Sequence, residues 1–237
     1  MVRTNVFRFT VVACLLFVAL TTAAMLTYPG GHIRHAHING YAFFLDSLSD
    51  LGETRTPTGR PKVASLVFFC SALLLVACTL PAFFVAYATL FARDSASRWI
   101  AIAGACAALI AGLSFAGVAG SPANLNQSLH NVFEFAAFWS FLAAVLCGFL
   151  AAVCSRSVPR SIGFVFGAFA ILLAAYLGFS ALGHILVNPS LRTRILFGAT
   201  PQKVVMYASI LTIMIQAATL ARLPPGSTSK SPRCAAN

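Results

Sequence analysis

The sequence predicts an all-α, polytopic membrane protein: a six-transmembrane-helix bundle with a long first extracytoplasmic loop. Of its 237 residues, 59% are hydrophobic and 9% are charged, whereas charged residues make up about a quarter of an ordinary soluble domain. Six apolar runs are each long enough for a hydrocarbon core that takes roughly 20 helical residues to cross. Lys and Arg are densest in short segments between alternate runs, as the positive-inside rule expects.

The predicted spans cover residues 7–28, 63–91, 99–118, 129–154, 162–182 and 204–220. Arg3 and Arg8 precede the first run, and small residues near its end leave open a cleaved signal peptide. A retained span is favoured because the apolar run exceeds the roughly 7 to 15 residues of a signal core. We therefore assign 1–222 to one six-span membrane domain. The remainder, 223–237, is rich in Pro, Ser and Thr and is predicted to be a disordered cytoplasmic tail.

Two features inside the spans concern helix packing. Pro81 removes one backbone donor from the second span and is expected to kink that helix rather than end it. Gly163 and Gly167 form a GxxxG spacing in the fifth span, which lets a neighbouring helix approach closely. Packing within the chain is favoured over dimerisation, and the oligomeric state stays open.

The basic residues orient the predicted bundle in the cell membrane with both termini in the cytoplasm. The segments placed inside contain one acid, Asp94, and nine basic residues: Arg3, Arg8, Arg93, Arg98, Arg156, Arg160, Arg222, Lys230 and Arg233. This distribution accounts for the net charge of +11 without a nucleic-acid partner. The seven cysteines form no CxxC or zinc spacing, and no disulfide framework is expected.

All histidines and most acids then fall on the outer side, where we expect the functional site. Asp46 and Asp50 lie four residues apart in the apolar stretch 43–52, and on a helix they would share one face. An apolar setting that separates their pKa values would make them a general acid and base, or they would be metal ligands. The alternative is that they cap or hydrogen-bond the loop, a common role for carboxylates at this spacing.

His130 and Glu134 form a second pair, one helical turn apart at the start of the fourth span. Glu134 would lie about 9 Å inside that span, and a carboxylate within the membrane is a functional candidate. Otherwise it would be protonated and bonded to a hydroxyl such as that of Ser114 or Ser180. His184, at the end of the fifth span, joins these four residues as a candidate catalytic group or simply caps its helix.

Two further groups lie on the same predicted side. His32, His35 and His37 occupy a Gly-rich stretch, where a solvated loop is more common than a metal site. Arg192 and Arg194 alternate with apolar residues, which suits binding of lipid phosphate at the membrane interface. Plain positional anchoring explains the two arginines equally well. These patterns specify no particular metal or cofactor.

A few positions resemble a known family. Ser49-Asp50-Leu51-Gly52, followed by Pro61 and an apolar span with Phe68-Phe69, resembles the bacterial membrane proteins grouped as domain of unknown function 998. His130-Asn131 is similar to the His-Asn position of that family. A more distant similarity is to six-helix proteins of the FRAG/DRAM/Sfk type, some of which are linked to lipid or GPI-anchor handling. The resemblance implies the six-span fold more than an activity, because the bacterial family has no settled one.

Two functions are expected from these observations. The first is a membrane protein that processes or binds lipids of the outer leaflet through a carboxylate and histidine site, with membrane lipids as its partners. The second is a non-catalytic accessory or scaffold subunit of a membrane complex. A proton-coupled carrier is less favoured, because carriers place polar groups near the midplane, where the inner halves of the spans offer little beyond Gln216. Whether the protein is an enzyme stays open.

Overall fold

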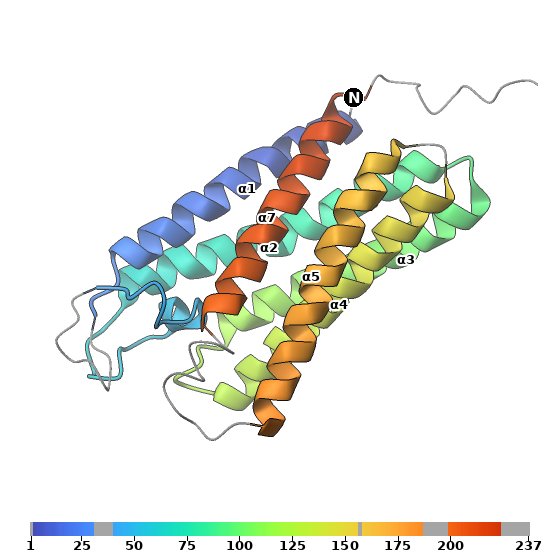
Figure 1. Cartoon of the computed structure of the whole chain (residues 1–237). Helices are drawn as coiled ribbons and strands as arrows, with labels where there is room; N and C mark the ends of the chain where they lie inside the picture. Colours follow the sequence, from blue (N-terminus) through green and yellow to red (C-terminus); the bar gives the residue numbers. More distant parts are fainter. Residues whose placement is uncertain (1, 31–39, 156–157, 187–198, 224–237) are drawn as a thin grey trace, which may run out of the picture.

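The computed structural model describes residues 2–30, 40–155, 158–186 and 199–223, and the side chains of 182–186 lie outside that description. Its six long helices (Figure 1) are α1 (Val2–Leu26), α2 (Val63–Ala88), α3 (Ser95–Gly120), α4 (Gln127–Cys154), α5 (Arg160–Leu186) and α7 (Thr200–Ala221). Two 3₁₀ helices, η1 (Ser49–Gly52) and η2 (Thr89–Phe91), flank α2. All six long helices are apolar and long enough to cross a membrane. The predicted all-α, six-span fold is therefore confirmed.

Polar caps explain why helices begin before the apolar runs. At the start of α3, the Asp94 carboxylate accepts a hydrogen bond of 3.2 Å from the Ser97 amide. At the start of α4, the Asn126 side chain accepts one of 3.0 Å from the Leu129 amide. Such caps satisfy amide groups that have no partner in the first helical turn. The helical ranges consequently exceed the hydrophobic ranges from which the spans are predicted.

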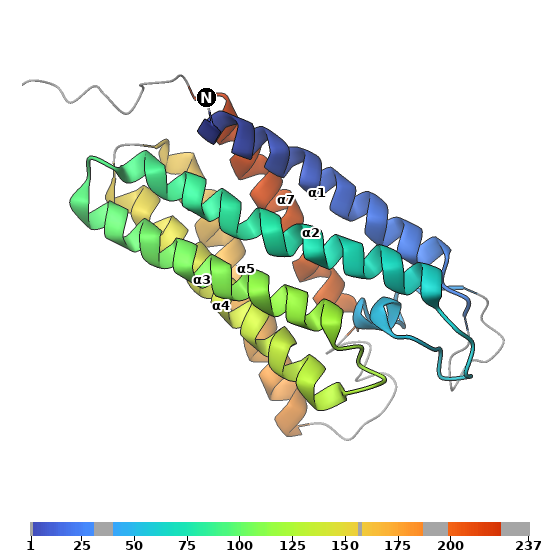
Figure 2. The same ribbon diagram turned by 180° about the vertical axis from the view of Figure 1, so that it is seen from behind.

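The helices close into a bundle. Each long helix packs against its neighbours in the sequence, and α7 contacts both α5 and α1. Figures 1 and 2 show this arrangement from opposite sides. The first apolar run belongs to the bundle, because Phe7 and Phe17 of α1 are 0% and 1% exposed and lie in the hydrophobic core.

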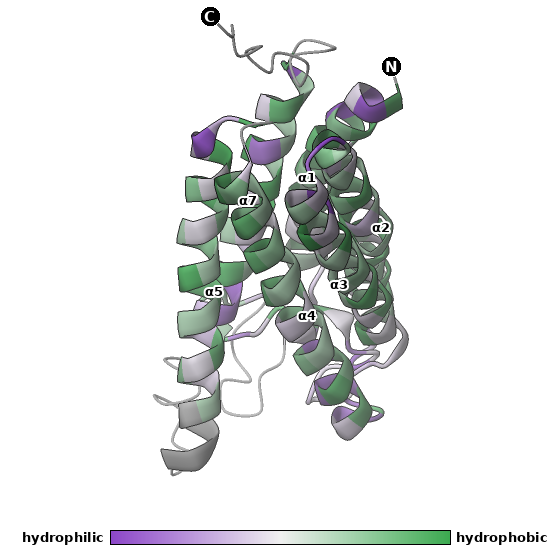
Figure 3. Ribbon diagram, turned by 90° about the vertical axis from the view of Figure 1, so that its right-hand side faces the viewer, coloured by the Kyte–Doolittle hydropathy of each residue, from purple (hydrophilic) through white to green (hydrophobic). Residues whose placement is uncertain are grey.

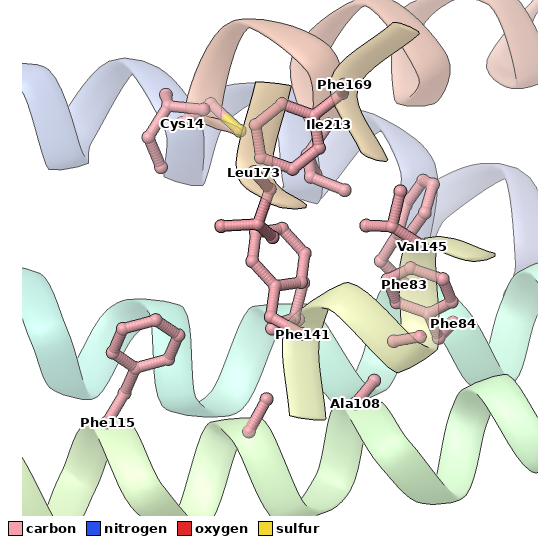
Figure 4. Close-up of a cluster of buried hydrophobic side chains, with 14 of the residues drawn as sticks. Cys14, Phe83, Phe84, Ala108, Phe115, Phe141, Val145, Phe169, Leu173 and Ile213 are labelled. Carbon is pink, nitrogen blue, oxygen red and sulfur yellow. The ribbon is translucent and has the colours of Figure 1, made fainter. Parts of the chain in front are cut away.

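Aromatic rings fill the middle of the bundle (Figure 4). Phe83 and Phe84 of α2 meet Phe166 of α5, with ring centroids 6.5 and 5.9 Å apart. Phe141 of α4 meets Phe169 of α5 at 5.6 Å. Each such pair contributes about 0.5–1.5 kcal/mol beyond the burial of its area. Figure 3 shows the hydrophobic colour along the helices, with hydrophilic colour mostly at their ends.

Gly112 allows a close approach of α3 to α2. A Cβ at Gly112 would lie 2.6 Å from the carbonyl oxygen of Ala77 and 2.8 Å from the Pro81 ring. This carbonyl lies four residues before Pro81, which has no N–H to donate to it. Helix α2 nevertheless continues through Pro81 to Ala88. Because Gly112 has no side chain, the backbones of α3 and α2 can meet at this position.

The GxxxG pair of α5 packs inside the chain, as favoured from the sequence. A Cβ at Gly163 would lie 3.1 Å from the Val153 side chain, and one at Gly167 would lie 3.1 Å from the Phe149 ring. Both neighbours belong to α4. Because lipid tails are as apolar as the helices, close packing of this kind is a main source of attraction between them.

Buried polar side chains add hydrogen bonds between helices. The Tyr87 hydroxyl of α2 donates to the Gly148 carbonyl of α4 at 2.9 Å. Gln216 of α7 donates to the Ile162 carbonyl of α5 at 2.7 Å. Gln216 therefore joins two helices of the bundle. This accounts for the amide that the sequence places in an otherwise apolar span.

The candidate residues lie at one end of the bundle. Successive helices alternate in direction, so the loop between α1 and α2 meets the starts of α4 and α7 (Figure 1). The start of α1, the end of α7 and the connection that contains Asp94 lie at the opposite end. Loop residues 40–62 contact the first turn of α7 through Gln202 and the connection before α4 through Asn124.

Candidate functional site

Eight side chains form a polar group at this end, here called the loop-end cluster. Its members are Asp46, Asp50, Glu53, Lys62, His130, Glu134, Gln202 and Lys203. The loop, the start of α4 and the start of α7 each contribute to it. Its geometry decides which of these groups are engaged within the protein and which are available to a ligand.

Asp46 organises the first turn of the loop. Its side chain is buried, and its carboxylate accepts a hydrogen bond of 2.8 Å from the Ala42 amide. The Tyr41 hydroxyl donates to the backbone carbonyls of Asp46 and Ser47, at 3.1 and 3.0 Å. Burial, followed by the nearby carboxylates, raises the pKa of Tyr41, so the phenol keeps its proton and remains a donor.

Asp50 organises the second turn. Its carboxylate accepts a hydrogen bond of 2.7 Å from the Ser47 amide, and the Ser47 hydroxyl accepts one of 3.2 Å from the Asp50 amide. This reciprocal pairing resembles a capping box and forms the short helix η1. The stretch 43–52 is therefore a turn followed by a 3₁₀ helix. Asp46 and Asp50 do not share the face of an α-helix, because each carboxylate is bonded to the backbone of its own turn.

Lys62 lies under the loop with its side chain 0% exposed. Its ammonium is 2.7 Å from the Glu53 carboxylate and donates to the Asp50 carbonyl at 2.6 Å. It also lies 4.9 Å from the centre of the Tyr28 ring. Burial raises the pKa of Glu53 above its ordinary value, although the hydrogen bond and charge of Lys62 act in the opposite direction. Loss of Lys62 would leave a half-buried acid without this cation.

Lys203 attaches the loop to α7. The residue is 2% exposed, and its ammonium donates to the carbonyls of Asp46 and Ala199. The rings of Tyr41 and Phe43 lie 5.4 and 5.2 Å from the same nitrogen. Cation–π contacts of this kind are strongest where water is excluded. The amine is therefore bound by backbone oxygens and aromatic faces.

Gln202 links three parts of the site. Its amide nitrogen donates to the Glu134 carboxylate of α4 at 2.7 Å, and its carbonyl oxygen accepts from the Leu48 amide of the loop at 3.1 Å. The partner of Glu134 is thus an amide of α7, and not a hydroxyl such as that of Ser114 or Ser180, which was the alternative to a functional role. The difference arises because the first turn of α7 lies beside the loop at the level of Glu134.

His130 differs from its neighbours because one ring nitrogen is not engaged. The residue is 2% exposed, and its Nδ1 lies 2.7 Å from the Ser121 carbonyl at the end of α3. A carbonyl only accepts, so Nδ1 carries the hydrogen and a neutral ring has a bare Nε2. Nε2 is buried and has no hydrogen-bond partner in the part of the chain that the structure describes. This nitrogen is an oriented acceptor for a proton or a donor group.

The loop is also fixed to the connection between α3 and α4. The Thr54 amide donates to the Asn124 side chain at 3.1 Å, and the Asn124 amide group donates to the Thr54 hydroxyl at 2.9 Å. Beneath the loop, a Cβ at Gly52 would lie 2.7 Å from the Phe69 ring. Only glycine fits this contact without movement of the ring.

The structure brings Asp46, Asp50, His130 and Glu134 to the same end of the bundle. The last turn of α5 contains His184, but the description does not extend to its side chain. Five other predicted residues lie outside the described ranges: His32, His35, His37, Arg192 and Arg194. The described residues contain no group of three His, Cys, Asp or Glu side chains that could hold a metal ion.

Four members of the cluster were not singled out from the sequence: Glu53, Lys62, Gln202 and Lys203. A signal was present for the last three, because each lies at the very start of an apolar run, where a polar side chain can reach back into a loop. The two lysines bond backbone carbonyls, which no residue pattern identifies.

Fold and site together define a multi-pass α-helical membrane protein with a buried polar cluster at one end. Comparisons with protein-family models, curated proteins and solved structures gave no significant match. The resemblance described from Ser49-Asp50-Leu51-Gly52 and His130-Asn131 therefore stays a prediction.

Proposed function

We propose that this protein binds lipids of the outer leaflet of a cell membrane, with the polar head of the lipid held at the loop-end cluster. In this proposal both termini are cytoplasmic and the loop 40–62 is outside. One observation carries the proposal: His130 Nδ1 is hydrogen-bonded to the Ser121 carbonyl while its buried Nε2 is left without a protein partner in the described part of the chain.

The chemistry of Nε2 determines which kind of head group can bind there. A neutral imidazole accepts a hydrogen bond from a hydroxyl or an ammonium group, both of which are common in lipid head groups. A buried acceptor gains more from such a partner than an exposed one does, because leaving it unpaired is unfavourable. The ligand is thus a head group with a donor.

The same geometry would serve catalysis. A nitrogen held within hydrogen-bond distance of a hydroxyl is placed to act as a general base. The Ser121 carbonyl fixes the tautomer that such a base needs. Glu134 and the loop carboxylates would then position the lipid, because hydrogen bonds to Gln202, Ala42 and Ser47 already hold them.

A specific observation favours the second candidate, a non-catalytic accessory subunit. The carboxylates of Asp46 and Asp50 bond backbone amides, and the ammonium groups of Lys62 and Lys203 bond backbone carbonyls. These groups build the loop. A fixed loop of this kind offers a surface for another membrane protein.

Lipid retention tests the proposal. Wild-type protein, His130→Asn and His130→Gln are purified in the same mild detergent, and bound lipids are counted by native mass spectrometry. Asn places a donor where Nδ1 lies and has nothing where Nε2 lies, whereas Gln reaches the position of Nε2. We expect His130→Asn to remain folded and to lose bound lipid, with partial retention in His130→Gln. Equal lipid content in all three proteins would contradict head-group binding at His130.

A further inference from the structure

A cavity of about 40 Å³ lies between the helices of the bundle and is partly open to its surroundings. Residues from α1, α2, α3, α4 and α7 line it, among them Cys14, Thr79, Phe115, Phe141, Ser209 and Ile213. Figure 4 shows Cys14, Phe115, Phe141 and Ile213 in this part of the core. No member of the loop-end cluster lines the cavity, so it is a separate feature of the fold.

Thr79 contributes a polar side chain to the lining of the cavity. The residue is 5% exposed, and its hydroxyl is buried without a hydrogen-bond partner among the described residues. Other helical threonines behave differently: the hydroxyls of Thr10 and Thr219 donate to the carbonyls four residues earlier, at 2.9 and 2.8 Å. The Thr79 hydroxyl is therefore available to a guest in the cavity.

Size and charge define that guest. A water molecule needs only about 10–15 Å³ of such space, whereas an engineered cavity of about 150 Å³ binds benzene. This cavity thus holds one to a few heavy atoms. The cavity lining contains no Lys, Arg, His, Asp or Glu, which favours a neutral molecule because an unpaired charge is strongly disfavoured in an apolar site.

The hydrogen-bonding groups of the lining fit a hydroxyl. The Ser209 hydroxyl donates to the Met206 carbonyl at 2.7 Å and keeps lone pairs that can accept. A guest hydroxyl can accept from Thr79 and donate to such an acceptor. We propose that the cavity binds a small neutral hydroxyl compound, water or a short-chain alcohol, through the Thr79 hydroxyl.

The test combines a substitution of equal shape with a direct view of the cavity. Thr79→Val replaces the hydroxyl with a methyl group, and Thr79→Ser keeps the hydroxyl. Thr10→Val is the matched control, because Thr10 is fully buried and its hydroxyl is already paired within its own helix. Thermal unfolding of the full chain is measured in lipid nanodiscs, and high-resolution maps are obtained with and without added ethanol.

The wild-type map should contain density within hydrogen-bond distance of Thr79 Oγ1, and Thr79→Val should remove it and lower Tm more than Thr10→Val does. Single-atom density without ethanol identifies water, and density that lengthens with ethanol identifies an alcohol site. If the Thr79 hydroxyl binds no guest, Thr79→Val should instead raise Tm, because replacing an unpaired buried hydroxyl with a methyl group is favourable. A raised Tm in Thr79→Val, with no density in the wild-type cavity, would overturn the proposal.

Discussion

The Lys62 ammonium and the Glu53 carboxylate are 2.7 Å apart, with the two side chains 0% and 17% exposed. Breaking such a pair from one side leaves the other charge without its partner in a poorly solvated place. We expect Lys62→Met to lower the free energy of unfolding by about 3 kcal/mol, the low end for buried pairs, because Glu53 keeps some exposure. Thermal unfolding in detergent checks this. The double variant Lys62→Met/Glu53→Gln should recover part of the loss, and no recovery would argue against the pair.

The pH dependence of stability follows from Glu53. Burial raises its pKa in the folded protein above the ordinary value of 4.5, so the folded state holds this proton to higher pH than the unfolded state does. Its contribution to the free energy of unfolding therefore decreases as pH rises from about 4.5 through the raised value. Lys62→Met should extend this decrease to higher pH. Unfolding curves measured from pH 4 to 8 should show this decrease in stability. The added substitution Glu53→Gln should abolish the difference between wild type and Lys62→Met.

Gly112 gives a test of the helix packing. Gly112→Ala places a Cβ against the backbone oxygen of Ala77 and the ring of Pro81, neither of which can rotate away. We expect a loss of about 1–3 kcal/mol from overpacking. Gly120→Ala in the same helix is the matched control, since a Cβ there meets nothing within 4 Å. Equal Tm values for the two variants would show that α3 and α2 do not meet in this way.

Gln202 is predicted to hold the loop to α4 and α7. Gln202→Leu leaves the Glu134 carboxylate and the Leu48 amide without this partner. Leaving a buried polar group unpaired lowers the free energy of unfolding by about 1–3 kcal/mol. Gln127→Leu is the control, because Gln127 is exposed and its side chain bonds Asn131 in its own helix. Changes at exposed positions of this kind stay within about 0.5 kcal/mol. Limited proteolysis should cut the loop 40–62 faster in Gln202→Leu alone. Unchanged cleavage would contradict this role.

The six spans were predictable because hydropathy is summed over about 20 residues, so single errors have little effect. Helix starts were less predictable, since caps such as Asp94 and Asn126 lie outside the apolar runs. That the first loop lies at the same end of the bundle as His130 and Glu134 follows from alternating helix direction alone. The contact of Lys203 with the loop does not, because its partner there is the backbone carbonyl of Asp46, which the turn places.

The pairing of Ser47 with Asp50 shows another limit of the sequence. A spacing of four residues at Asp46 and Asp50 suits an α-helix, yet side-chain bonds to the local backbone compete with helix formation for Ser and Asp. Here those bonds produce η1. The approach of Gly112 to Ala77 likewise depends on how two helices are rotated, which their composition does not determine.

The predicted orientation is tested by labelling introduced cysteines. Ser95, the first residue of α3, and Thr58, in the loop 40–62, are both exposed and lie at opposite ends of the bundle. An impermeant maleimide applied to intact cells should label Thr58→Cys and leave Ser95→Cys unlabelled beyond the background of the native cysteines. The reverse pattern would place the loop-end cluster in the cytoplasm and exclude the outer leaflet as its source of lipid.

Direct contact between a lipid head group and His130 is the central claim. Nanodiscs that contain a phospholipid with a diazirine in its head group are irradiated, and labelled peptides are identified by mass spectrometry. We expect labels on the loop 40–62 and on the first turns of α4, strongly reduced in His130→Asn and unchanged in Asn131→Ala, an exposed neighbour. Labelling that is the same in wild type and His130→Asn would contradict the account.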